Sequence, residues 1–252
     1  MLSQPNKSKL FKIPHWIPSL PPPSSVYNTE PPTYQEVTRA INKCKAKSCP
    51  CPLDQISVIM LKRCPQLRTV LHKLIVACWQ KSCIPTCWKR GLTVLIYKKG
   101  DSNDPANFRP ITLQPVMYKI LSSVMRNRLF TFVDNNNYID KHVQKGFWPA
   151  VDGVTEHTQL LSHLMNDAKR HQRALCVTLL DLRNAFGEVH HNLIKSAMAY
   201  HHVPDEIVNL IDNIYTDSFI QVSYNNSVTS SMRPSLPTVV QFMFQHINEN
   251  YN

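Results

Sequence analysis

The chain has 252 residues, with 28 lysines and arginines against 17 aspartates and glutamates; its formal net charge is +11, and 43% of its residues are hydrophobic. This composition indicates a globular protein, while the five glycines and the lack of a GxGxxG or Walker sequence argue against a dinucleotide-binding or P-loop protein. The positive charge favours a polyanionic partner, nucleic acid first and an anionic membrane second, with a basic surface that serves only solubility as the alternative.

Eight prolines in residues 1–32 predict an extended leader that we expect to be flexible. Regular structure is expected from Thr33 onward. Thr33 and Glu36 fit a capping box, in which each side chain binds a backbone amide of the first helical turn. Apolar residues at helical spacing then predict a helix that ends near Lys47.

Apolar periodicity and helix-breaking residues predict nine further elements. In chain order these are a short helix at 56–61, a helix from Pro65 towards Pro85, a strand at 92–97, helices at 116–132 and 154–168, a strand at 174–180, helices at 190–200 and 205–215, and a strand at 219–224. Together they predict a helix-rich α/β or α+β fold.

Details of these elements can be compared directly with a structure. The helix that begins at Pro65 is expected to bury one apolar face, made of Leu67, Val70, Leu71, Leu74, Ile75 and Cys78. Residues 98–110 are expected to be a polar loop, and Asn225-Asn226 a turn. Residues 174–180 form a short, nearly all-apolar run, which is typical of a buried central strand.

No apolar run approaches the roughly 20 residues that span a bilayer, and the first 20 residues lack the apolar core of a secretory signal. We therefore expect an intracellular protein without a membrane span. Its eight cysteines should be free thiols. Cys83 and Cys87 have the spacing of a zinc-ligand pair, but a second suitably spaced pair is missing.

Asp181 directly follows the apolar run and precedes a segment expected to turn into a helix. A strand end is a rigid position for a ligand, and Mg²⁺ prefers carboxylate oxygens, so Asp181 is a candidate metal ligand. The alternative is that Asp181 caps the next helix, and this residue pattern alone favours the cap.

Two further segments carry basic residues in suggestive contexts. Lys98 and Lys99 follow a predicted strand and precede Arg109, an arrangement that can hold phosphates, although a solvated charged loop is the alternative. Residues 144–147, Gln-Lys-Gly-Phe, combine a cation, a glycine and an aromatic ring, which can follow a nucleic acid backbone and stack on a base.

In this order and spacing, these segments resemble the reverse transcriptases of non-long-terminal-repeat, LINE-like retrotransposons, over about residues 33–229. The motifs that carry the resemblance are Trp88, Lys98-Lys99-Gly100-Asp101, Asn107-Phe108-Arg109-Pro110-Ile111, Tyr118-Lys119-Ile120, Arg128-Leu129, Gln144-Lys145-Gly146-Phe147 and Asp181 through Phe186. The resemblance implies part of a right-hand polymerase fold, with fingers at 33–145 and a partial palm at 146–229. Residues 230–252 remain unmatched.

The resemblance also implies roles for individual residues. Asp181 corresponds to the first catalytic aspartate, which binds Mg²⁺ together with the carbonyl of Leu182, and Phe186 to the aromatic gate that selects deoxynucleotides. The residues that would hold the incoming triphosphate are Lys98 or Lys99 and Arg109. Those that would contact the template are Gln144, Lys145, Gly146 and Phe147. The implied partners are an RNA template and a DNA primer, and the implied location is the nucleus.

Departures from the family pattern change what we expect of this chain. The sequence has no Asp-Asp pair, which the family carries downstream for polymerisation, and residues 49–54 lack the two glycines usual in that segment. We therefore expect a truncated fragment that is inactive on its own. One alternative is a domesticated nucleic-acid-binding module, and another is a polymerase completed by carboxylates from a second chain.

Overall fold

The computed structural model describes residues 13, 16–45, 50–104, 107–146, 148, 151–181, 189–224 and 227–230. In these residues the helices are α1 (Tyr34–Lys43), α2 (Val58–Arg63), α3 (Pro65–Lys81), the 3-10 helix η1 (Thr86–Lys89), α4 (Val116–Asn135), α5 (Gly153–Arg170), α6 (His191–Tyr200) and α7 (Asp205–Tyr215). The strands are β1 (Arg90–Tyr97), β2 (Phe108–Leu113), β3 (Phe219–Tyr224) and β4 (Ser227–Val228). The predicted mixture of helix and sheet is confirmed.

The four strands form one sheet in the order β2-β1-β3-β4. β1 and β2 are an antiparallel hairpin, whereas β1 and β3 are parallel and are joined through α4, α5, α6 and α7. The prediction of a polar loop over 98–110 is wrong at its end, because β2 begins at Phe108. Pro110 cannot donate a ladder hydrogen bond, and β2 tolerates it because it is an edge strand.

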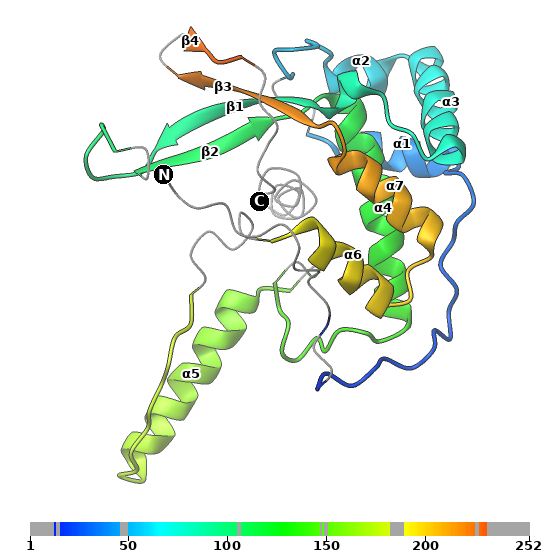
Figure 1. Cartoon of the computed structure of the whole chain (residues 1–252). Coiled ribbons are helices and arrows are strands. Elements are labelled where there is room, and N and C mark those ends of the chain that lie inside the picture. The colour runs from blue at the N-terminus through cyan, green and yellow to red at the C-terminus, as the bar shows by residue number, and fades with distance from the viewer. Residues whose placement is uncertain are drawn as a thin grey trace.

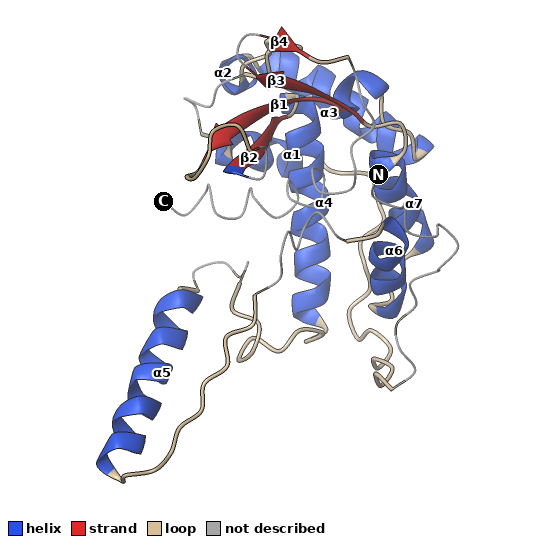
Figure 2. Ribbon diagram, turned by 60° about the vertical axis from the view of Figure 1, so that its left-hand side comes forward, coloured by secondary structure: helices blue, strands red, loops and turns tan. Residues whose placement is uncertain are grey.

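The helices other than α5 form a body, with the sheet along one edge (Figures 1 and 2). The core lies between them. Its fully buried apolar side chains come from the leader-proximal helices and from α4 and α7, and they include Ile41, Leu61, Leu71, Ile75, Ile120, Leu121, Met125, Ile207, Leu210 and Ile214. None of the helices in the described residues is both long enough and apolar enough to cross a bilayer.

Local signals account for several helix ends. The predicted capping box is present: the Glu36 amide donates to Thr33 Oγ1 at 3.2 Å, and the Thr33 amide donates to Glu36 Oε2 at 2.8 Å. The helix ends at Lys43, four residues before the expected end. α3 begins at Pro65, as predicted, and ends at Ser82 in the left-handed region, at φ 46°.

Only half of the predicted apolar face of α3 is buried. Leu71, Ile75 and Cys78 lie in the core, whereas the other three predicted residues are largely exposed: Leu67, Val70 and Leu74. α3 lies at the outside of the helical body, where it contacts α1 and α2 along one narrow side (Figure 1). A narrow contact buries a single stripe of a helix and leaves the flanking apolar residues in solvent.

Arg128 of α4 joins four segments of the chain. Its Nε and Nη2 donate to the two carboxylate oxygens of Glu36 at 2.8 and 2.9 Å, and its Nη1 donates to the carbonyls of Asn28 and Glu30. Its guanidinium also lies 5.0 Å from the ring centroid of Trp79 in α3. α1, α3, α4 and the leader are therefore held by one buried cation.

The leader is extended, as predicted, but residues 18–32 lie against the body rather than free of it. The hydroxyls of Tyr200 and Tyr138 donate to the carbonyls of Pro18 and Pro21 at 2.7 and 3.1 Å. Tyr27 is buried, with its ring edge-on to Phe132. The body therefore holds this part of the leader in place, contrary to the expectation of a flexible segment.

The predicted buried strand over 174–180 is wrong. Residues 173–181 have no regular secondary structure, and Leu179 and Leu180 are 87% and 93% exposed. The segment runs beside α5, which itself has no buried residue and extends away from the body in both views (Figures 1 and 2). An apolar run becomes a buried strand only where a sheet edge is available, and both edges of β1 are already paired, with β2 and β3. The predicted turn at Asn225-Asn226 lies outside the described residues.

We expect Arg128→Met to lower the free energy of unfolding by about 3 kcal/mol, because it leaves the Glu36 carboxylate and two leader carbonyls without their donor. Urea denaturation measures this loss. The control is Lys141→Met, which removes the exposed ion pair between Lys141 and Asp134 and should cost about 1 kcal/mol or less. Equal losses in the two variants would contradict the central role of Arg128.

Acid should weaken the same interaction. The hydrogen bonds from Arg128, with a further contribution from Thr33, lower the pKa of Glu36 from 4.5 to about 2 despite its partial burial. Because this pKa is lower in the folded chain, the stabilisation is complete above about pH 4.5 and is lost as the pH falls towards 2. The gap in unfolding free energy between the parent chain and Glu36→Gln should narrow over this range, and a constant gap would argue against it.

Candidate nucleic-acid interface

The β1–β2 hairpin is closed at its tip by a small set of contacts. The Lys98 amide donates to the Asn107 carbonyl at 2.8 Å, and the Tyr97 hydroxyl donates to the Gly100 carbonyl at 2.5 Å. Gly100 has a φ of 103°, and a Cβ there would lie 2.8 Å from Asn107 Nδ2. The tip therefore requires glycine, since other residues would be strained and would clash.

The hairpin brings together the three cations that the sequence assigned to phosphate binding. Arg109 pairs with Ile96 across the strands, and Lys98 lies two residues beyond Ile96, so strand alternation places Arg109 and Lys98 on one face. Lys99 follows at the tip. All three side chains are exposed, and in the described residues none of them forms a hydrogen bond or ion pair.

The charges near this tip are partly balanced. Asp101 and Asp104 lie in the same loop, and Asp101 Oδ1 accepts a hydrogen bond from the Asn103 amide at 2.9 Å. Tyr97 and Phe108 stack edge-on across the strands, with centroids 5.6 Å apart. The tip thus presents unpaired cations beside exposed aromatic surface, a combination suited to phosphates and bases.

The proposed template segment lies elsewhere, in the loop that follows α4. Gln144 Nε2 donates to the Gly146 carbonyl at 3.2 Å, and Lys145 Nζ is ion-paired with Glu156 of α5 at 2.6 Å. Gly153 allows this approach, because a Cβ there would lie 2.4 Å from the Cβ of Lys145. Lys145 is therefore engaged with a carboxylate, and Phe147 lies outside the described residues.

Asp181 is exposed and ends the extended segment that follows α5, so it does not lie at a strand end. Leu182 and Phe186 lie outside the described residues. Across the ranges that the structure describes, no three histidine, cysteine, aspartate or glutamate side chains come together as metal ligands. The described donors therefore do not fit a two-metal centre, nor the zinc site considered for Cys83 and Cys87, whose thiols are free.

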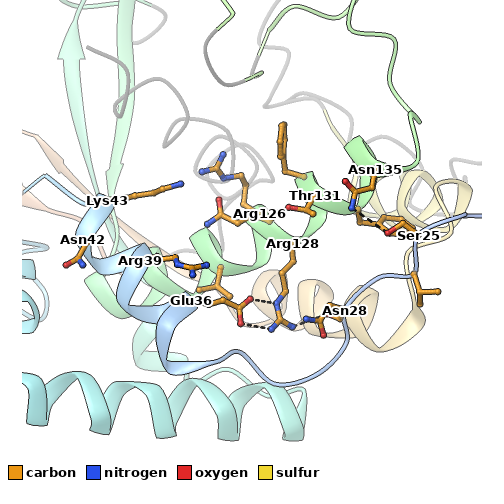
Figure 3. Close-up of a pocket in the computed structure, with 15 residues that line it drawn as sticks. Ser25, Asn28, Glu36, Arg39, Asn42, Lys43, Arg126, Arg128, Thr131 and Asn135 are labelled. Carbon is orange, nitrogen blue, oxygen red and sulfur yellow. Dashed lines mark hydrogen bonds and ion pairs between the residues drawn. The ribbon is translucent and has the colours of Figure 1, made fainter.

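Sequence reasoning missed a second group of cations. Arg39 and Lys43 of α1 line a cavity together with Arg126 and Arg128 of α4 (Figure 3). The i, i+4 spacing of Arg39 and Lys43 was visible in the sequence and predicts a shared helix face. The contribution of α4 was not, because it depends on how α1 packs.

The model of the family described as "Reverse transcriptase (RNA-dependent DNA polymerase)" matches residues 96–245. This is more than half of the chain. The chain belongs to the reverse transcriptase family. The match begins at the end of β1 and includes the hairpin tip, Lys145 and Asp181. It also continues past Thr229 into the segment that the motifs left unmatched.

The curated relatives are retrotransposon proteins. The chain is 31% identical to a Pol polyprotein of the R2 element of Nasonia vitripennis over 143 residues, which are 57% of this chain and 13% of that protein. It is 29% identical to the R2 protein of Popillia japonica over 192 residues, 74% of this chain and 25% of that protein. It is 27% identical to the RNA-directed DNA polymerase of the jockey element of Drosophila melanogaster over 214 residues, 83% and 22%.

These matches confirm the non-long-terminal-repeat kind of reverse transcriptase. The reverse transcriptase chain spans a quarter or less of the length of these three relatives. The family uses divalent metal ions with an RNA template and a DNA primer, and which of these functions the 252 residues retain depends on their own site.

Proposed function

We propose that this reverse transcriptase chain binds RNA through its β1–β2 hairpin and does not polymerise DNA by itself. One observation carries the second half of the proposal: the sequence has Asp181 in a Leu-Asp-Leu setting but no Asp-Asp pair anywhere. Polymerisation by two metal ions needs carboxylates that hold two cations about 3.5–4 Å apart. A single exposed carboxylate does not supply them.

The proposed binding site rests on the exposed cations of the hairpin. Lys98, Lys99 and Arg109 extend from a rigid two-stranded element and have no competing partner in the described residues. Arg109 can donate two parallel hydrogen bonds to a phosphate, whereas each lysine acts as a point charge. In a complete polymerase the same residues would hold the incoming triphosphate, and here they are free to bind a nucleic acid backbone.

The remaining site residues enter the proposal with narrower roles. Gln144, Lys145, Gly146 and Phe147 would contact the template, with Lys145 first leaving Glu156. Asp181 would be the one retained catalytic carboxylate, with Leu182 and Phe186 beside it in sequence. By this assignment residues 33–145 correspond to the fingers and 146–229 to a partial palm of a right-hand polymerase, and Mg²⁺ would be the metal of a completed site.

A second candidate function is a polymerase completed by another chain. It is favoured by the exposure of Asp181 and of the apolar segment before it, since an added strand could cover both. The missing carboxylates would then come from that chain. A domesticated RNA-binding module, in contrast, needs only the hairpin.

We expect the triple substitution Lys98→Ala, Lys99→Ala and Arg109→Ala to weaken RNA binding and to flatten its dependence on salt. Each lost phosphate contact releases fewer counterions, and the slope of log affinity against log salt should fall by about 0.7 per contact for single strands. Titration of a labelled RNA at several salt concentrations measures both effects. Asp181→Asn is the control, and it should bind as well as the parent or slightly better because a negative charge is lost.

Primer extension on an RNA template with Mg²⁺ tests the catalytic half of the proposal. We expect no incorporation by the parent chain, because the carboxylates for two metal ions are absent. Incorporation that is abolished by Asp181→Asn would show that the chain is an active polymerase. Incorporation that appears only after a second chain is added would favour the completed enzyme instead.

A further inference from the structure

A recess of about 850 Å³ lies between α1, α4 and the leader, away from the β1–β2 hairpin (Figures 1 and 3). We call it the α1–α4 groove. Four cationic side chains line it: Arg39 and Lys43 from α1, and Arg126 and Arg128 from α4. Glu36 is the one carboxylate among its lining residues.

The single carboxylate is already used. Both oxygens of Glu36 accept from Arg128, at 2.8 and 2.9 Å, and Oε2 also accepts from the Thr33 amide at 2.8 Å. Glu36 therefore neutralises Arg128, and the charges of Arg39 and Lys43 remain uncompensated. Both of these side chains are exposed, and in the described residues neither has a hydrogen-bond or ion-pair partner.

Arg39 and Lys43 are also neighbours on one helix face, at i and i+4, where like charges repel each other. An anion between them removes this repulsion. Figure 3 shows both side chains extending along the same side of α1 as the groove, with Arg126 facing them from α4. Two segments of the chain thus converge with positive charge on one recess.

The rest of the lining is polar and suits bases and sugars. Amide and hydroxyl side chains line the groove beside the cations, namely Ser25, Asn28, Asn42, Asn127, Thr131 and Asn135. Amides can both donate to and accept from base edges, and the splayed bases of single-stranded RNA expose such edges. A flat anionic membrane surface would reach the rim cations but not the amides inside the recess.

We propose that the α1–α4 groove binds the backbone and bases of a short single-stranded RNA segment, as a second contact in addition to the hairpin. The inference rests on the proposed function, in that both sites bind RNA. It adds a site to which α1 contributes two of the four cations. α1 precedes the residues that the family model matches, whereas α4 lies within them.

The test compares two double variants in a titration of fluorescent oligouridine RNA at several salt concentrations. Arg39→Gln with Lys43→Gln removes the uncompensated groove cations. Arg63→Gln with Lys73→Gln removes the same charge from exposed positions of α2 and α3. The groove variant should bind more weakly than the control variant, with a salt slope shallower than the parent's by about 1.4, which corresponds to two lost phosphate contacts.

A charge-preserving swap, Arg39→Lys with Lys43→Arg, guards against a folding effect and should bind nearly as well as the parent. Equal losses in the groove and control variants would overturn the proposal, because net charge alone would then explain them. So would unchanged RNA affinity combined with lost binding to phosphatidylserine vesicles.

The same titration separates this inference from the proposed hairpin site. If the hairpin triple variant binds like the parent while the groove variant binds weakly, the hairpin site fails and the groove site stands. If only the hairpin variant binds weakly, the groove site fails. If the parent chain does not bind RNA at all, both fail.

Discussion

The buried guanidinium of Arg128 is the constraint on which the arrangement of the helices depends. A buried cation is costly unless its donors are all satisfied, and here a carboxylate from α1 and two carbonyls of the leader satisfy them. Those acceptors come from segments about 90 to 100 residues away in the chain. The orientation of α1 against α4, and with it the recess between them, follows from this requirement.

The sheet imposes a second constraint, on what the rest of the chain can do. β1 has partners on both sides, so a further central strand has no place beside it. The apolar segment after α5 therefore stays in solvent, and Asp181 stays with it. In this structure the residue with the strongest sequence assignment is thus the one with the least structural support.

Local patterns in the sequence predicted the elements whose causes are local. The capping box at Thr33, the strand ending at Tyr97 and the helix from Asp205 to Tyr215 all match the structure. The failures involve partners distant in sequence: β2 through Pro110 needs an edge position, and residues 174–180 lack a sheet edge. For the site, the sequence identified the hairpin cations, whose grouping follows from one turn, but not the groove, whose cations meet only through helix packing.

The leader is bound through its main chain. Carbonyls of Pro18, Pro21, Asn28, Thr29 and Glu30 accept hydrogen bonds from Tyr200, Tyr138, Arg128 and Trp79. Proline has no amide hydrogen but keeps its carbonyl, so a proline-rich strap suits a body that supplies only donors. Evolution can therefore rewrite many leader side chains without loss of docking, whereas the donor side chains of the body cannot drift. Among relatives, variability in the strap would accordingly be compatible with an unchanged path over the helices.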